Sequence, residues 1–265
     1  MAFRLKKAAC LIFLLFILSN SVTATEKIVI FHLGHGEINF RDVSASKNLT
    51  AEQVSPLTLV GTNDYCEMKL KLVEDKKVHL FGIGFNSAKK FKYDSGIRTI
   101  KRPDDERLDF RIFYEMNHYL FRNIFPNLDV AIGPNVCFSH INTARYFSTD
   151  TKLNFLENQF SAAFVLAMRY SSSRSWYFRA SFANGGLFGL ERTKHNLYGR
   201  MPETNFVNGW ISKLNISWTL FLFQKIGFSA FLEREEKVKV GKKFQYVESD
   251  SRFGLSVVYR LGEKR

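Results

Sequence analysis

The sequence predicts an all-β fold, an antiparallel transmembrane β-barrel of about ten strands within a range of 8–12. Two observations predict it. About ten short stretches alternate apolar and polar residues, which is the pattern of strands that have one apolar face. The segments between these stretches are by turns short and long, as in barrels whose tight turns and long loops lie at opposite ends.

The first residues predict a cleavable signal peptide over 1–24. Basic residues precede an unbroken apolar run, Leu11–Leu18, and Val22-Thr23-Ala24 places small residues where signal peptidase reads them. The apolar run is far shorter than the roughly 20 residues of a membrane-spanning helix. No linker-like stretch follows, so we expect one outer-membrane barrel domain over 25–265.

The strands can be placed in order from their alternation. In the clearest stretch Leu128, Val130 and Ile132 alternate with small or polar residues. The predicted strands are 27–40, 57–73, 77–90, 107–121, 127–140, 158–171, 175–185, 209–222, 225–235 and 250–261. Tight links are expected at 74–76, 122–126, 172–174 and 223–224, and long links at 41–56, 91–106, 141–157, 186–208 and 236–249. An even strand number puts both termini on the tight-turn side, which is the periplasmic side of bacterial barrels.

In the second half of the chain, the residues on the two faces of each predicted strand favour a barrel with lipid outside and a polar interior. Even-numbered positions carry large apolar side chains such as Phe160, Leu166 and Trp218, whereas odd-numbered positions carry polar ones such as Arg169 and Lys213. A soluble periplasmic sandwich or lipocalin-like barrel is the alternative, with the apolar face inward. It would have to pack much of a set of 27 phenylalanines into a narrow interior.

Charges of both signs share the inward parity. The predicted lumen network comprises Glu67, Lys69, Arg111, Glu115, Arg169, Arg179, Lys213, Glu233 and Arg252. In a narrow bore, mixed charges favour a salt-bridged plug, for which Arg179 and Glu233 are one candidate couple. A small-solute pore is the alternative, although a selective pore more naturally shows one sign of charge.

Two long links are rich in basic residues. The predicted basic surface loops contain Lys89, Lys90, Lys92, Arg98, Lys101, Arg102, Lys237, Lys239, Lys242 and Lys243. On the cell surface they could pair with lipopolysaccharide phosphates, or they could be solvated loops balanced by nearby acids. The net charge is +13, but nucleic acid is not an expected partner outside the cell.

The last strand adds a more specific feature. Arg252, Gly254, Val257 and Tyr259 resemble the C-terminal insertion signal of bacterial outer-membrane proteins, with a polar residue, a glycine and two apolar or aromatic residues at fixed spacing. That strand usually ends the chain on an aromatic residue, whereas this chain runs on to Arg265. The resemblance implies insertion into the outer membrane by the barrel-assembly machinery.

One group of residues partly matches a known catalytic pattern. There is no Asp-x-Asp and no Asp-x-His, which counts against the omptin surface proteases, and no metal-ligand spacing or phosphate-binding loop occurs. The segment 138–144 followed by Glu157 resembles the lipid A deacylase barrels, which makes His140 and Glu157 the candidate catalytic residues. Asn142 stands where that family has its nucleophilic serine. A histidine at the membrane interface is the other interpretation of His140.

These observations together favour an outer-membrane barrel with a structural or surface-interaction role and a plugged polar lumen. A small-solute pore and an outer-leaflet lipid hydrolase remain as alternatives. We expect no cofactor and no metal, outer-membrane lipid as the surroundings, and termini in the periplasm. The oligomeric state and the pairing of Cys66 with Cys137 are left open by the sequence.

Overall fold

The structure is a computed structural model that describes residues 26–42, 58–94, 99–102, 105–148, 151–173, 175–195, 203–241 and 245–263. The predicted signal peptide lies outside these residues. Regular structure in the described part of the chain is all strand. The strands are β1 (Glu26–Asp42), β2 (Thr58–Val73), β3 (Lys77–Asp94), β4 (Thr99–Arg102), β5 (Glu106–Phe121), β6 (Leu128–Ser148), β7 (Thr151–Ser173), β8 (Trp176–His195), β9 (Glu203–Phe221), β10 (Ile226–Gly241) and β11 (Gln245–Glu263). None of the described residues forms a helix long and apolar enough to cross a membrane.

Ten of these strands close into one antiparallel barrel. Going round the ring the order is β1, β11, β10, β9, β8, β7, β6, β5, β3 and β2, and β2 pairs with β1 to complete it. The four-residue strand β4 pairs only with the end of β3 and stands outside the ring. The prediction of an antiparallel barrel of about ten strands is confirmed.

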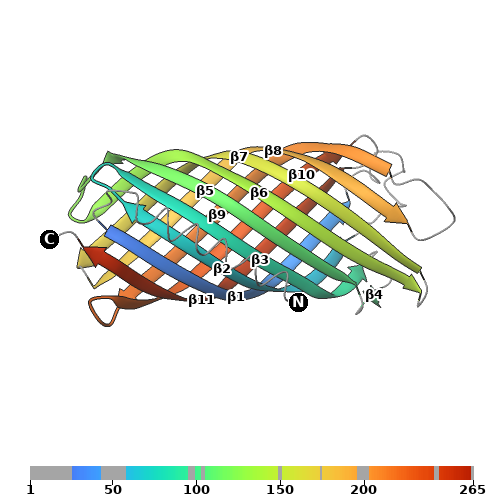
Figure 1. Cartoon of the computed structure of the whole chain (residues 1–265), viewed down its shortest axis with the longest axis horizontal. Helices are drawn as coiled ribbons and strands as arrows, with labels where there is room; N and C mark the ends of the chain where they lie inside the picture. The colour runs from blue at the N-terminus through green and yellow to red at the C-terminus, as the bar shows by residue number, and fades with distance from the viewer. Residues whose placement is uncertain are drawn as a thin grey trace.

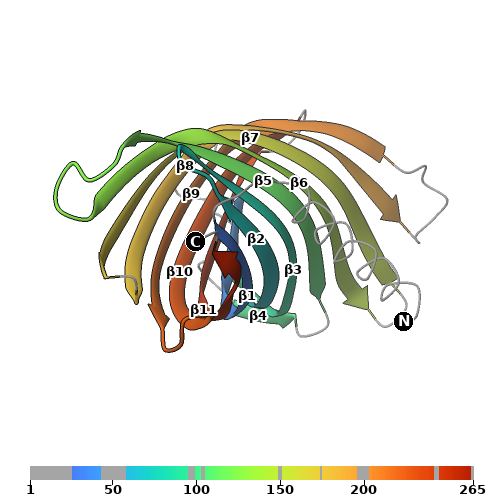
Figure 2. The same cartoon turned by 60° about the vertical axis from the view of Figure 1, so that its left-hand side comes forward.

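The two ends of the barrel differ, as Figures 1 and 2 show. At one end, called the turn end below, β1 begins and β11 finishes, and Glu26 lies opposite Glu263 in the register. Tight connections between β2 and β3, β5 and β6, β7 and β8, and β9 and β10 lie at the same end. The opposite end is called the loop end. Asn123 and Asn127 have positive φ values of 54° and 73°, a backbone conformation that asparagine tolerates in a tight turn.

Burial in this barrel is the reverse of burial in a soluble protein. Phe164, Leu166 and Trp218 point outward and are 57%, 44% and 52% exposed, while Arg252 and Glu233 point inward and are 1% exposed. A soluble barrel would leave this large aromatic surface in water. The apolar exterior fits a hydrocarbon surrounding, and the soluble alternative is rejected.

The strands run further toward the loop end than the alternation predicts. β6 continues to Ser148 and β7 begins at Thr151, so most of the predicted link 141–157 is paired strand. Within the former link the outward position Asn142 is polar, so the apolar signal stops there while backbone pairing continues. The predicted loops were therefore too long.

One consequence is a correction to the predicted basic loops. Lys237 and Lys239 lie in β10, and their side chains are buried in the lumen at 3% and 0% exposure. The prediction that they belong to a surface loop was wrong. Their odd-numbered positions continue the inward facing of Glu233 and Glu235. The predicted strand ended at residue 235, so this pattern was not extended to Lys237 and Lys239.

Candidate functional site

The lumen holds many charged side chains. All nine side chains of the predicted lumen network face inward and are buried or half-buried: Glu67, Lys69, Arg111, Glu115, Arg169, Arg179, Lys213, Glu233 and Arg252. A charge inside a protein must be paired or hydrogen-bonded to be tolerated. The pattern of partners therefore decides what the lumen can do.

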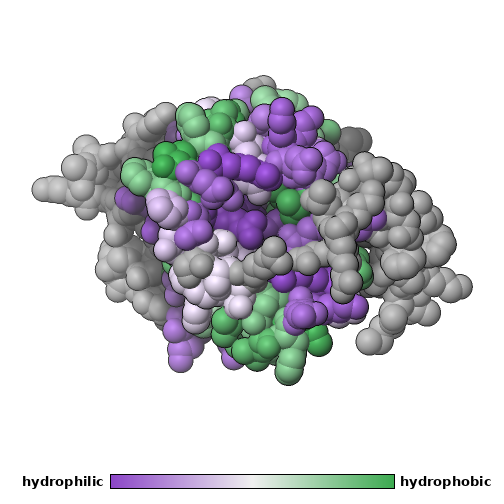
Figure 3. All heavy atoms as spheres, turned by 90° about the vertical axis from the view of Figure 1, so that its left-hand side faces the viewer, coloured by the Kyte–Doolittle hydropathy of each residue, from purple (hydrophilic) through white to green (hydrophobic). Residues whose placement is uncertain are grey.

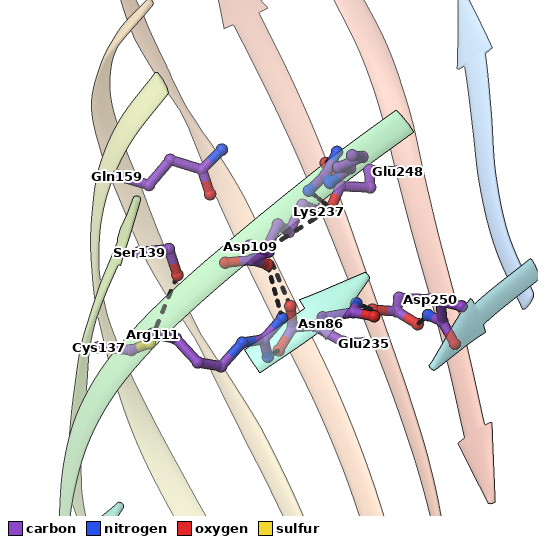
Figure 4. A network of polar contacts seen from close by, with 12 residues as sticks. Asn86, Asp109, Arg111, Cys137, Ser139, Gln159, Glu235, Lys237, Glu248 and Asp250 are labelled. Carbon is purple, nitrogen blue, oxygen red and sulfur yellow. Dashed lines mark hydrogen bonds and ion pairs between the residues drawn. The ribbon is translucent and has the colours of Figure 1, made fainter. Parts of the chain in front are cut away.

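An ion-pair chain crosses the whole bore (Figure 4). Arg111 on β5 donates to Asp109 on its own strand at 2.9 Å and to Glu235 on β10 at 3.1 Å. In the ring of ten strands β5 and β10 are five steps apart in either direction, so they are opposite walls. Direct contact between Arg111 and Glu235 thus joins the two walls at this level.

Toward the loop end the chain continues through Glu248 on β11. Arg107 on β5 donates to its two oxygens at 2.7 and 3.3 Å, and Lys239 pairs with it at 2.9 Å. Lys239 also donates to Glu157 on β7 at 3.0 Å, and Lys237 pairs with Glu235 at 2.9 Å. These residues are called the upper ion-pair layer, where upper means toward the loop end: Arg107, Asp109, Arg111, Glu157, Glu235, Lys237, Lys239 and Glu248.

Arg252 anchors a second group beside this layer. Its guanidinium donates to Glu233 at 2.9 Å and, through two nitrogens, to Asp250. Lys213 on β9 pairs with Glu233 at 3.1 Å, and Asn63 donates to Asp250 at 2.6 Å. The first residue of the predicted insertion signal is thus a fully buried member of the lumen, while Val257 and Tyr259 point outward.

Near the turn end the pairing is less complete. Arg179 on β8 donates to Glu115 on β5 at 2.6 Å. Lys71 on β2 and Arg169 on β7 instead lie against the ring of Tyr177, at 5.3 and 4.8 Å from its centroid. Because β2 and β8 are also five steps apart, the contact of Lys71 with Tyr177 joins opposite walls at a second level.

A cavity lies between these two levels. Its volume is about 90 Å³, enough for several water molecules. Polar or small side chains of β7 to β9 form one wall, and Lys69, Lys71 and Lys213 are among the charged groups that line it. Apolar Ile28, Tyr177, Phe221 and Val258 pack together at the turn end of the lumen.

The two candidate catalytic residues lie on opposite faces of the wall. His140 points outward, and its Nδ1 lies 2.8 Å from Oδ1 of Asn158, its register partner on β7. Glu157 points into the lumen, where it binds Lys239. The structure does not bring them together, so the deacylase-like site that their sequence positions suggested is not formed.

The remaining predicted residues lie in several places. Lys89, Lys90, Lys92 and Lys101 are exposed at the loop end of β3 and on β4, and Lys90 has a positive φ of 55°. Arg98, Lys242 and Lys243, and the side chain of Arg102, lie outside the described residues. Cys66 faces outward, Cys137 faces the lumen, and both are free thiols. No group of metal-binding side chains is found in the described part of the chain.

Comparison with solved structures agrees with this architecture. The outer membrane protease OmpT from Escherichia coli matches with a TM-score of 0.68 at 8% identity, covering 91% of this chain and 98% of OmpT. The chain therefore has the fold of an outer-membrane β-barrel. The translocator domain of the autotransporter NalP from Neisseria meningitidis matches with a TM-score of 0.42 at 10% identity over 96% of both chains. No protein-family model matches the barrel, and no curated protein matches its sequence.

Several members of the charged lumen were missed by the sequence analysis. The predicted network omits Arg107, Glu235, Glu248 and Asp250, and Glu157 was considered only as a catalytic candidate. These residues could have been found because charged residues continue at odd-numbered positions on β5 and β10 and at even-numbered positions on β11. That parity extends past the point where outward residues cease to be apolar.

Proposed function

We propose that the protein is a closed outer-membrane barrel with a structural or surface-interaction role, and that its lumen does not conduct solutes. The observation that carries this proposal is the direct contact between opposite walls, at Arg111 with Glu235 and at Lys71 with Tyr177. Residues of both crossings line the cavity between them, which supports a blocked lumen.

The chemistry of the crossing also argues for closure. A selective pore presents one sign of charge along a wetted path, whereas here each lysine and arginine of the upper ion-pair layer binds a carboxylate. Buried pairs of this kind hold a fixed geometry because separating them leaves a charge without a partner. Most of these ion pairs link different strands across the lumen and hold them in a fixed arrangement.

A surface role is supported by the loop end. The strand extensions carry the barrel beyond its apolar belt, and exposed Lys89, Lys92 and Lys101 lie there. We propose that the loop end faces the outside, that both termini are periplasmic, and that these lysines pair with lipopolysaccharide phosphates of the outer leaflet. Insertion by the barrel-assembly machinery is part of the same proposal.

Planar-bilayer recording tests the closed lumen. The purified, heat-modifiable protein is expected to give no steady unit conductance, because both crossings block the bore. An outer-membrane porin reconstituted in the same way is the positive control. Steady conductance from the unmodified protein would overturn the proposal in favour of a small-solute pore.

A further inference from the structure

The charge balance at the turn end of the lumen is incomplete. Among the basic side chains that line the cavity, Lys69, Arg111, Arg179, Lys213 and Lys237 each pair with a carboxylate. Lys71 also lines the cavity and is 5% exposed, yet it has no ion pair and no hydrogen bond with any described residue. A buried ammonium group without an acceptor is costly to hold in a folded protein.

Arg169 on β7, four strands round the ring from the β2 of Lys71, repeats this feature. Its Nε is buried without a hydrogen-bond partner, and its guanidinium lies against the same Tyr177 ring as Lys71. In the register Arg169 stands directly opposite Arg179 on β8, so two like charges face each other across adjacent strands. Like charges in that position destabilise a sheet unless something neutralises them.

The carboxylates nearby are engaged elsewhere. Asp129 is the register partner of Arg169 on β6, but its carboxylate accepts from the backbone N–H of Asn123 at 3.3 Å and forms no ion pair with Arg169. Glu26 pairs with Arg260 at 2.9 Å, and Glu115 binds Arg179. Of the described carboxylates around this end of the cavity, none forms an ion pair with Lys71 or Arg169.

We propose that the turn end of the lumen cavity is a binding site for a small tetrahedral oxyanion of the phosphate class, held by Lys71 and Arg179, which line the cavity, and by Arg169, which lies beside them against the ring of Tyr177. Cations from three strands suit an anion with acceptor oxygens in several directions, and arginine presents a planar fork to phosphate. Figure 3 shows hydrophilic side chains in the middle of the face at the turn end, the end of the lumen nearest this site. It is inorganic phosphate, a phosphate monoester, or the phosphate of a lipid headgroup.

Titration calorimetry with inorganic phosphate tests the site on the whole barrel, purified in a nonionic detergent without phosphate. Chloride and acetate at matched ionic strength serve as controls. Saturable binding of phosphate is expected, with affinity lowered about tenfold or more by Lys71→Met or Arg169→Gln. Lys225→Met, which removes an exposed lysine at the same end, is expected to leave the affinity unchanged.

A second measurement separates a ligand site from a purely structural cluster. In phosphate-free buffer Lys71→Met is expected to unfold at the same or a higher denaturant midpoint than the unmodified barrel, because it removes an unpaired buried charge. Phosphate is expected to raise the midpoint of the unmodified barrel but not that of the variant. If Lys71→Met fails to fold, Lys71→Gln and Arg169→Lys take its place in both measurements.

The source of the anion is distinguished by phosphorus analysis of the delipidated protein. A headgroup site retains phospholipid in the unmodified barrel and loses it in Arg169→Gln, whereas a site for free phosphate is empty after purification and fills on titration. Either result supports the site. Absence of both phosphate binding and retained phospholipid overturns it, as does phosphate binding that is equal in the unmodified barrel and the variants.

Discussion

At the scale of single residues, position in the wall decides whether a lysine is structural. Lys239 and Lys92 look alike in sequence, since both lie in basic segments beyond the clear apolar alternation. Lys239 is fully buried between Glu157 and Glu248, whereas Lys92 is exposed at the end of β3. The two residues therefore offer a matched comparison of a lumen cation and a surface cation.

Lys239→Met is expected to destabilise the barrel by about 3–5 kcal/mol, because Glu157 loses its cation and stays buried. Lys92→Met is expected to change the stability little. Denaturant unfolding in lipid vesicles, followed by tryptophan fluorescence, measures both. Equal, small effects would mean that Lys239 is a loop residue after all.

The buried couple of Arg252 and Asp250 predicts non-additive energetics. Arg252→Met alone leaves Asp250 to the amides of Asn63 and Asn86, and Asp250→Asn alone leaves the guanidinium with Glu233 only. The double variant removes both charges together, so its cost is expected to fall short of the summed single costs by about 0.5–3 kcal/mol. A double-mutant cycle on unfolding free energies measures this difference, and strict additivity would show that the pair is not coupled.

At the scale of strands, the outer face of β7 is predicted not to tolerate a charge. Leu166 lies on the outer face, with Phe182 as its register partner on β8. Leu166→Arg places a cation in the hydrocarbon and is expected to cost about 2–4 kcal/mol and to lower the yield in outer membranes. Leu166→Phe keeps the face apolar and is the control, with heat-modifiable migration as the assay of assembly. Normal stability and yield of Leu166→Arg would place this face away from lipid.

The orientation of the strands can be checked by cysteine labelling in a background that carries Cys66→Ser and Cys137→Ser. Lys101→Cys on β4 at the loop end is expected to react with an impermeant maleimide on intact cells. Asp75→Cys in the tight connection of β2 to β3 is expected to react only after the outer membrane is opened. The reverse pattern would place the loop end in the periplasm and invert the proposed orientation.

Strand identity and facing could be read from the sequence because both depend on local alternation. That Arg169, Arg179 and Lys213 face the lumen was predicted from their odd-numbered positions alone. Strand length could not be read in the same way, because outward residues beyond the apolar belt are polar and the alternation disappears while β6 and β7 remain paired. The ion-pair partner of each lumen charge could not be predicted from the sequence either. Arg179 was offered with Glu233 but binds Glu115, since contacts across a lumen depend on strand tilt and side-chain reach.

At the scale of the whole molecule, two contacts between distant walls lie in series along the lumen. The upper ion-pair layer joins β5 to β10 and β11, and the contact of Lys71 with Tyr177 joins β2 to β8. Two constrictions in series block a passage as long as either one stands. The proposed closure is therefore expected to resist single substitutions, even though each pair contributes separately to stability.

This arrangement predicts that conductance appears only when both constrictions are removed. A charge-balanced variant carries Arg107→Ser, Arg111→Ser, Glu235→Ser and Glu248→Ser, which takes away the contacts of β5 with the opposite wall without changing the net charge. That variant and Tyr177→Ser are each expected to remain silent in planar bilayers, and their combination to show discrete openings. Heat-modifiable migration of all three variants confirms that the barrel is folded. Conductance in one of the parent variants would mean that the other constriction does not seal, and silence of the folded combination would place the closure elsewhere in the lumen.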